Sequence, residues 1–470
     1  SLKCDVIAHG VIIGGYLENG LPTQAVQVFG QMQQRGVKPD RVIVLSTLKA
    51  ISTLECLHEG RLLHIHILIN GFESEISVLN TLIDMYVKCG MLFDAEEVFN
   101  RLPVRSAFSW AALITGYIEL GHQEDVCNCL ERMHLDNIHP DLILFACILR
   151  ACSCIEDRDK GLAVHTQILQ EGFEGDIVIG SALIDMYVKF GLLAEAEVML
   201  YKLQVRTVFT WTTLITGYVC HGFDDSALDC FERMQEEFIS PDDITLACTL
   251  NACGNLGSKN KGRKVFSQIA YKGLERDTYI GNSLVDMYVK CGLLDEAQKI
   301  FNGLLVKSEI AWTTLITGYA QAGESENVFM TFARMLEANA KPTGVTFISI
   351  LNACSHGGVV EEGEWYLYAM IKYFECIPTL EHYSCIVDIL GRAGHLEKAI
   401  AVIECMPFHP VNVVWVTLLG ACRKWGSVEL GQEAFIHTQQ LDENDVAAHI
   451  CMLNIYMKGN IEMIRYWEFF

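Results

Sequence analysis

The sequence has little positive charge and few prolines, and it contains no long apolar run. Lysine and arginine number 35 against 58 acidic residues, so the 470-residue chain has a formal net charge of −23. This balance argues against a uniformly basic nucleic-acid binder, although it leaves room for a basic stripe within an acidic molecule. Apolar residues make up 51% of the chain, yet no run of 18 of them occurs. A membrane is therefore not an expected partner.

The short motifs of common enzymes are missing as well. The sequence has no phosphate-binding loop, no Gly-x-Gly-x-x-Gly fingerprint and no nucleophile elbow. It has no Cys-x-x-Cys, and the pairs Cys127/Cys129 and Cys152/Cys154 have a different spacing. The 19 cysteines, an odd number without a tight framework, indicate reduced thiols. We therefore expect no metal, no cofactor and no catalytic residue.

What the chain does contain is repetition at an interval of 101 residues. The segment VDMYVKCGLLDEAQKIF, which starts at Val285, returns in altered form from Ile83 and from Ile184. Gly-Tyr pairs, tryptophans and four of the nine prolines keep the same interval, at Tyr16, Tyr117, Tyr218, Tyr319, Trp110, Trp211, Trp312, Pro39, Pro140, Pro241 and Pro342. A fixed period of this kind indicates an array of structural repeats.

The period divides into units of 35, 35 and 31 residues, such as 208–242, 243–277 and 278–308. Each unit holds two apolar-periodic segments of roughly a dozen residues, separated by a glycine that stops the first segment. Each unit is thus predicted to be a helix–turn–helix, and stacking of neighbours buries the faces that one hairpin leaves open. The predicted fold class is all-α, a right-handed superhelical α-solenoid of helix–turn–helix repeats.

The repeat register also indicates where the cysteines lie. Cys89 and Cys291 align with Phe190, while Cys152, Cys253 and Cys354 align with Ile51. Positions that accept Phe or Ile are apolar core positions, so we expect these thiols to lie in the core rather than to bind a ligand.

Two families have two-helix units of about this length. Part of the tetratricopeptide pattern matches Trp211, Leu214, Tyr218, Ala227 and Phe231, but Gly217 and Pro241 fall outside its positions. The ending VKPD at 37–40, the Gly-Tyr pairs and the triplets of 35, 35 and 31 residues instead resemble the plant organellar pentatricopeptide repeat proteins. The resemblance is to the PLS subclass, in which P, L and S repeats alternate, and it covers essentially the whole chain.

This resemblance implies a domain organisation. Residues 1–5 are the end of a truncated repeat, and 6–411 form the repeat array. The P units are 6–40, 107–141, 208–242 and 309–343; the L units are 41–75, 142–176, 243–277 and 344–379; the S units are 76–106, 177–207, 278–308 and 380–411. Residues 412–470 resemble the E extension of editing-type members, and the match fades from Ile461 to Phe470.

The resemblance also implies single-stranded RNA as the ligand, read at one base per unit by the fifth and the last residue. The implied base-reading pairs are Asn80 with Ser106, Ser181 with Thr207, Thr212 with Asp242, Asn282 with Ser308, and Thr313 with Thr343. In the family's code Asn/Ser favours C over U and Thr/Asp favours G, whereas Ser/Thr and Thr/Thr have no clear assignment. The expected RNA core is 5′-C-N-N-N-G-N-C-3′. Units with Gly10 or Ala111 at the fifth position are expected to discriminate poorly.

Two further sets of residues are implied. The second residue of a unit often flanks the base in this family, and the alternative is a place in the core between repeats; the set is Phe108, Val178, Phe209, Tyr279 and Ile310. A cation falls thirteenth in each S unit, at the expected end of the first helix; these are Lys88, Lys189, Lys290 and Arg392. A cation there complements the helix dipole, but we favour a row of contacts to RNA phosphates.

The function implied is sequence-specific RNA binding in a mitochondrion or chloroplast, most simply the choice of a cytidine for C-to-U editing. The transit peptide is expected outside this sequence. The deaminase of editing members has His-x-Glu followed by Pro-Cys-x-x-Cys, and the one His-x-Glu here, His395–Glu397, falls in a repeat turn. The chain itself is therefore not predicted to be an enzyme, and a deaminase or editing cofactor is expected as a partner through the C-terminal extension, or in a missing segment. The alternatives are a tetratricopeptide-like protein-interaction scaffold and an RNA stability or splicing factor.

Overall fold

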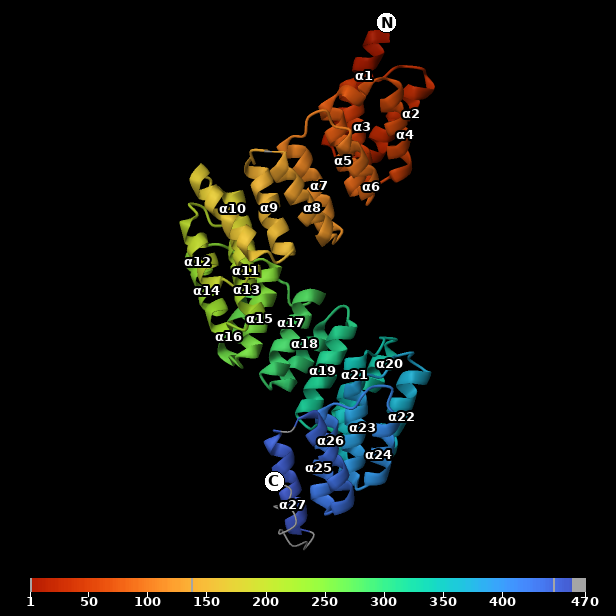
Figure 1. Cartoon of the computed structure of the whole chain (residues 1–470), viewed down its shortest axis with the longest axis vertical. Helices are drawn as coiled ribbons and strands as arrows, with labels where there is room; N and C mark the ends of the chain where they lie inside the picture. Colours follow the sequence, from red (N-terminus) through yellow and green to blue (C-terminus); the bar gives the residue numbers. More distant parts are fainter. Residues whose placement is uncertain (1, 137, 443, 459–470) are drawn as a thin grey trace. The chain divides into compact units, whose positions relative to one another are not determined.

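The structure, a computed structural model, describes residues 2–136, 138–442 and 444–458, and every regular element in these ranges is a helix (Figure 1). The all-α class and the solenoid of helix–turn–helix repeats are thereby confirmed, while the right-handed sense stays a prediction. The chain divides into two compact units, Ser1–Pro241 and Asp242–Phe470.

The first compact unit consists of seven consecutive helix pairs in its described residues. Their bounds are α1 Leu2–Glu18, α2 Pro22–Gln34, α3 Arg41–Leu54, α4 Leu57–Ile69, α5 Ile76–Lys88, α6 Leu92–Asn100, α7 Ala107–Glu119, α8 Gln123–Leu135, α9 Leu142–Cys154, α10 Arg158–Glu171, α11 Ile177–Lys189, α12 Leu193–Lys202, α13 Val208–Cys220 and α14 Asp224–Glu236. A short 3-10 helix, η1, covers Phe72–Ser74. Residues 2–5, expected to end a truncated repeat, contribute the first turn of α1.

The second compact unit continues the same design. Its helices are α15 Asp243–Asn255, α16 Lys259–Tyr271, α17 Thr278–Lys290, α18 Leu294–Gly303, α19 Glu309–Gln321, α20 Ser325–Glu337, α21 Gly344–Gly357, α22 Val360–Lys372, α23 Leu380–Ala393, α24 Leu396–Cys405, α25 Asn412–Trp425, α26 Val428–Leu441 and α27 Val446–Lys458. The region expected to be the E extension thus starts with another helix pair, α25 and α26. The segment 461–470, where the family match fades, lies outside the described residues.

Helix starts coincide with the unit boundaries because the last residue of most units caps the next helix. The side chains of Asp40, Asp141 and Thr207 accept hydrogen bonds from backbone N–H groups in the first turns of α3, α9 and α13. Such a side chain satisfies an N–H group that has no partner within the helix. The first helix of a pair ends before a glycine turn, as at Gly222, where φ is 77° and a left-handed backbone is needed.

Within each compact unit the first helices of successive pairs form one layer. Helix α7 packs on α9, α9 on α11 and α11 on α13, and in the second unit α15 packs on α17 and α17 on α19. Most second helices pack on their own first helix and on the first helix of the next pair, as α2, α6, α12 and α18 do, so the second helices form the other layer. Buried apolar side chains, among them Trp211 and Ile215, fill the space between helices.

The Gly-Tyr dipeptide that recurs every 101 residues forms contacts between consecutive helix pairs. A Cβ placed on Gly217 would lie 2.6 Å from a methyl carbon of Val188, so only glycine lets α13 approach α11 this closely. The neighbouring Tyr218 donates its hydroxyl to Glu197 at 2.8 Å, and Arg233 binds the same carboxylate at 2.8 Å. Tyr117, Glu96 and Arg132 repeat this arrangement one period earlier. The 101-residue interval therefore repeats a contact between an S unit and the P unit after it.

Four of the five aligned cysteines are buried, as the repeat register predicts, whereas Cys89 is only partly buried. Cys152, Cys253 and Cys354 are fully buried and form no disulfide. Burial raises the pKa of the Cys152 thiol to about 11 and that of Cys354 to about 12, so both stay protonated and unreactive at neutral pH.

Candidate nucleic-acid interface

The last residue of a repeat unit is held at the start of the following helix. Ser308 accepts a hydrogen bond from the backbone N–H of Ala311 at 3.1 Å, and Thr343 accepts one from Thr346 at 3.4 Å. Helix caps prefer small polar side chains such as Ser, Thr, Asp and Asn. The fold therefore favours hydrogen-bonding residues at the predicted base-reading position, although Val411 shows that other residues can stand there.

A first cavity opens beside Asn282 on the layer of first helices. It has a volume of about 340 Å³, and its lining includes Tyr279, Asn282 and Ile310. Tyr279 is the second residue of unit 278–308, Asn282 is its fifth, and Ile310 is the second residue of the next unit. Ser308, the last residue of the unit, donates a hydrogen bond of 3.0 Å to the side-chain oxygen of Asn282. This unit therefore brings its predicted reading pair and both flanking residues together.

A second cavity of about 430 Å³ lies in the next repeat. Its lining includes Ile310, Thr313, Thr343 and Val345, which are the corresponding positions of unit 309–343 and of the unit after it. The hydroxyl of buried Thr346 lies 2.8 Å from that of Thr313 and 3.1 Å from that of Thr343. The two predicted reading residues are thus linked through a third hydroxyl that sequence reasoning had not singled out. Ile310 lines both cavities and so separates one from the next.

The predicted base-flanking residues are exposed. Phe108, Val178, Phe209, Tyr279 and Ile310 have between 53% and 66% of their surface accessible, so they do not occupy the core positions of the alternative interpretation. Exposed apolar side chains that sequence reasoning missed occupy the same second position in other units: Val42, Ile143, Ile244, Val345 and Val413. The repeat register could have identified them, because each stands at the second position of its unit. Each compact unit therefore exposes a row of apolar side chains, one from most repeats.

Two other predicted pairs are arranged differently. Asn80 is partly buried and its side-chain oxygen has no hydrogen-bond partner, while Ser106 bonds with Ser109 instead. Ser181 donates to the carbonyl of Ile177, and Thr207 caps α13. Thr212 belongs to the first compact unit, where it is buried, and Asp242 opens the second, where it caps α15. The same residue types at the same register positions therefore do not always meet.

The four predicted phosphate-contacting cations all form local ion pairs. Lys88, Lys189 and Lys290 are the last residues of α5, α11 and α17, and Arg392 lies in the last turn of α23. Each pairs with the aspartate four residues earlier, at 2.8–3.0 Å; the aspartates are Asp84, Asp185, Asp286 and Asp388. Lys290 also donates to the side chains of Asn251 and Asn255. Asp286 also lines both cavities. The lysine charge beside them is therefore accompanied by a carboxylate and does not form a stripe of unpaired positive charge.

Nothing in the described residues resembles a metal centre. No group of three or more His, Cys, Asp or Glu side chains within these ranges could hold a metal ion. His395 precedes α24 in an exposed turn between two helices, as its sequence context indicates. Across the same residues, no helix combines the length and the apolar character needed to cross a membrane.

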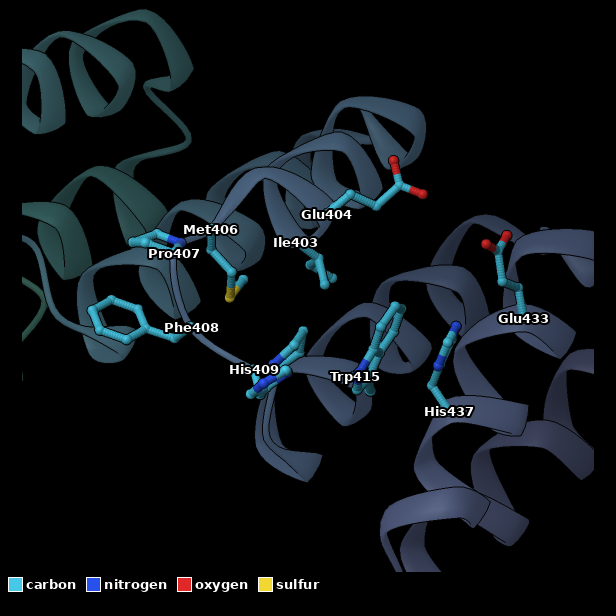
Figure 2. Close-up of a pocket in the computed structure, with 10 residues that line it drawn as sticks. Ile403, Glu404, Met406, Pro407, Phe408, His409, Trp415, Glu433 and His437 are labelled. Carbon is cyan, nitrogen blue, oxygen red and sulfur yellow. The ribbon is translucent and has the colours of Figure 1, made fainter.

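A further pocket lies where α24, α25 and α26 meet (Figure 2). The rings of Trp415 and His437 are stacked with centroids 4.1 Å apart, and His409 lies on the other side of the indole. Glu404 and Glu433 also line it, so its polar lining is acidic apart from the imidazoles. None of the predicted base-reading residues contributes to this pocket.

Comparison with known proteins agrees with this repeat architecture. The PPR repeat matches residues 7–37, 77–106, 181–208, 209–237, 282–308 and 381–409, the PPR repeat family matches 307–356, and the pentatricopeptide repeat domain matches 106–154. A mitochondrial pentatricopeptide repeat-containing protein of Arabidopsis thaliana is 32% identical over 94% of this chain and 70% of its own length. The chloroplastic pentatricopeptide repeat-containing protein DOT4 of the same plant is 36% identical over 97% of this chain and 52% of its own length.

The chain thus spans between about half and 70% of the length of these relatives. Among solved structures, that of the pentatricopeptide repeat protein PPR10 from maize superposes with a TM-score of 0.61 at 17% identity, over 97% of this chain and 77% of that one. This likeness concerns the fold. From the repeat matches and from the identity to plant relatives, the chain belongs to the pentatricopeptide repeat family.

Proposed function

We propose that the protein binds single-stranded RNA in a sequence-specific manner and that it does so in a mitochondrion or a chloroplast. The observation that carries the proposal is the cavity beside Asn282. An exposed aromatic ring, Tyr279, and an exposed apolar side chain, Ile310, bound a space whose polar lining includes Asn282. A base stacks on such side chains while its edge is read by a polar group. Relatives named as mitochondrial and as chloroplastic support the location.

The finer assignment is to the PLS subclass with an E-type extension at 412–470, acting to select a cytidine for C-to-U editing. Helix starts at 309, 344, 380 and 412 support units of unequal length rather than a uniform repeat. A deaminase-bearing protein or editing cofactor would then engage the extension. The pocket formed by Trp415, His437 and Glu433 is the surface at which we would look for that contact.

Selection from a randomised RNA pool tests the proposal. The expected motif is 5′-C-N-N-N-G-N-C-3′, with a cytidine as the editing target further downstream. The purified chain alone should leave that cytidine unchanged, and conversion should require an added deaminase. Absence of any RNA binding at low salt would overturn the proposal and favour a protein-interaction scaffold, which the net charge of −23 would suit.

A further inference from the structure

One helix of this acidic protein is strongly basic. Helix α16, Lys259–Tyr271, has the sequence KNKGRKVFSQIAY, with four cations and no carboxylate, hence a charge of +4. Among the second helices that the structure describes, all the others sum to zero or to a negative charge. Lys272 follows directly after the helix.

The repeat fold does not require these cations. The positions that correspond to Lys264 in the other L units hold Leu62, Ala163 and Trp365, and those that correspond to Lys259 hold Leu57, Arg158 and Val360. Lys259 and Lys261 also stand in the first turn of α16, which has no acidic residue. Cations there oppose the helix dipole and cost a few tenths of a kcal/mol or more each. A feature that works against local stability, without a role in packing, is typical of a functional surface.

The cations are available at the surface. Lys259, Arg263 and Lys264 are exposed, and only Arg263 of the three has an ion-pair partner within the described residues, Glu296 at 3.5 Å. The buried side of the helix is instead formed by Gly262, Val265 and Ile269. Positive charge that is neither buried nor neutralised attracts anions.

An exposed polar and aromatic strip runs along the same helix. Asn260, Lys264, Ser267 and Tyr271 follow one another at helical spacing and are all exposed, and 94% of the surface of Tyr271 is accessible. Lysine, amide and hydroxyl groups bind phosphate oxygens, and an exposed tyrosine offers a face on which a base can stack. Charge alone would also suit an acidic protein, but the aromatic ring beside the cations favours nucleic acid.

We propose that α16 is a second RNA-binding surface, on the layer of second helices, that holds the sugar-phosphate backbone of transcript flanking the stretch read by the first helices (Figure 1). It takes its ligand class from the proposed function but does not depend on base reading. Binding here is independent of sequence and adds affinity only for RNA longer than the recognised stretch. The surface thus adds a site of favourable electrostatic contact between an otherwise acidic protein and a long transcript.

The test compares two charge-matched double variants. Lys259→Gln/Lys264→Gln removes two cations from α16, and Lys372→Gln/Lys398→Gln removes two exposed ones from α22 and α24; each takes the net charge from −23 to −25. Dissociation constants are measured over a salt series for an RNA limited to the recognised stretch and for one extended by about fifteen nucleotides of random sequence on each side.

The wild type and the control variant should bind the extended RNA about tenfold more tightly than the short one, and the α16 variant should lose most of that gain. Its salt dependence on the extended RNA should fall by a slope of roughly 1.4, since each phosphate contact to single strands contributes about 0.7. Tyr271→Ala, which changes no charge, should lower affinity for the extended RNA alone. Unchanged helical circular dichroism verifies that the variants fold.

Equal behaviour of the two double variants, or no gain from extension in the wild type, would overturn the inference. Failure of the proposed function gives a different result. If the wild type binds random RNA as well as the expected motif, sequence-specific binding is refuted. If Lys259→Gln/Lys264→Gln then loses this binding, the role of α16 is still supported. If no RNA is bound, and a glutamate-rich peptide is bound by the wild type but not by the α16 variant, the surface serves an acidic protein and the RNA assignment is wrong.

Discussion

The hydroxyl of Ser308 donates a hydrogen bond of 3.0 Å to the side-chain oxygen of Asn282, twenty-six residues earlier in the chain. The same hydroxyl accepts from the backbone N–H of Ala311 at 3.1 Å, so its one proton is committed to Asn282. With its oxygen engaged by Ser308, the amide of Asn282 has its N–H groups left to offer to a base in the cavity that it lines. Cytosine N3 accepts such a donor, whereas uracil carries a proton at N3. This geometry would favour C over U at this position, in agreement with what the Asn/Ser pair is predicted to read.

Changing Ser308 to Asp should therefore reverse the amide. An ionised carboxylate still caps α19 but has no proton to donate, so it accepts from the amide nitrogen of Asn282 and turns the amide oxygen toward the base. We expect preference at this position to move from C to U by about 1–3 kcal/mol. Titration with two RNAs that differ only at this nucleotide measures the change. Ser308→Thr keeps a hydroxyl and should keep C; retention of C by Ser308→Asp would refute the mechanism.

The Lys290–Asp286 ion pair predicts that removing the acid strengthens RNA binding. Asp286→Asn leaves the charge of Lys290, which lines the second cavity, without this ion-pair partner. Affinity for every RNA should rise, by up to about fivefold, because an exposed charge pair contributes up to about 1 kcal/mol, and the salt dependence should become steeper. Asp295→Asn makes the same change in net charge on α18 and serves as the control. Weaker binding after Asp286→Asn would show that the carboxylate itself contacts RNA.

Tyr279 is expected to stack on the base beside Asn282. Tyr279→Ala should weaken binding by about 1–3 kcal/mol whichever base is present, because stacking tolerates any base. Electrophoretic or fluorescence titration with the four RNAs that vary at this nucleotide tests both the size and the uniformity of the loss. Tyr373→Ala removes another exposed ring, directly after α22, and should have no effect. A loss confined to one base would instead indicate that the Tyr279 hydroxyl reads an edge.

Two glycine substitutions should change stability in opposite directions. Gly217→Ala puts a Cβ about 2.6 Å from Val188 and should destabilise the fold by about 1–3 kcal/mol. Gly30→Ala, inside α2, meets no atom within 4 Å and should stabilise by about 0.5–1 kcal/mol through helix propensity. Thermal unfolding midpoints measure both. A stabilising Gly217→Ala would mean that α11 and α13 are not held at this separation.

Buried His382 predicts a loss of stability in mild acid. Its Nδ1 accepts a hydrogen bond from the backbone N–H of Thr379 at 3.1 Å, and its Nε2 donates one to the carbonyl of Gly344 at 2.9 Å. The folded protein therefore favours the neutral form of this imidazole. Burial lowers the pKa of His382 below the ordinary 6.5. The unfolded chain then takes up more protons, and stability that is fully present above about pH 6.5 is lost as the pH falls.

The measurement is the unfolding midpoint between about pH 7.5 and about pH 5.5. His382→Gln should lower the midpoint at neutral pH and flatten its pH dependence, whereas substitution of exposed His409 should leave the dependence as it is. Parallel pH curves for the wild type and His382→Gln would contradict the assignment.

Most of the fold was available from the sequence because its signals are local and repeated. Capping residues such as Asp141 and Thr207, turn glycines such as Gly222 and the apolar period of each segment act within a few residues. A 101-residue interval repeated these signals, so unit boundaries and helix starts could be located. Even the Lys290–Asp286 ion pair could be predicted from the i, i+4 spacing of its residues, although a role was assigned from the sequence only to the lysine.

The site was decided by tertiary structure. Asn80/Ser106 and Asn282/Ser308 have the same residue types at the same register positions, yet only the second pair forms a hydrogen bond. Exposure of Tyr279 and Ile310, and the link from Thr313 through Thr346 to Thr343, likewise depend on how neighbouring units pack. A repeat period fixes which backbone positions lie near each other. The rotamer and the hydrogen-bond partner of each side chain are fixed by contacts with residues that belong to the adjacent helix, and these differ from one repeat to the next.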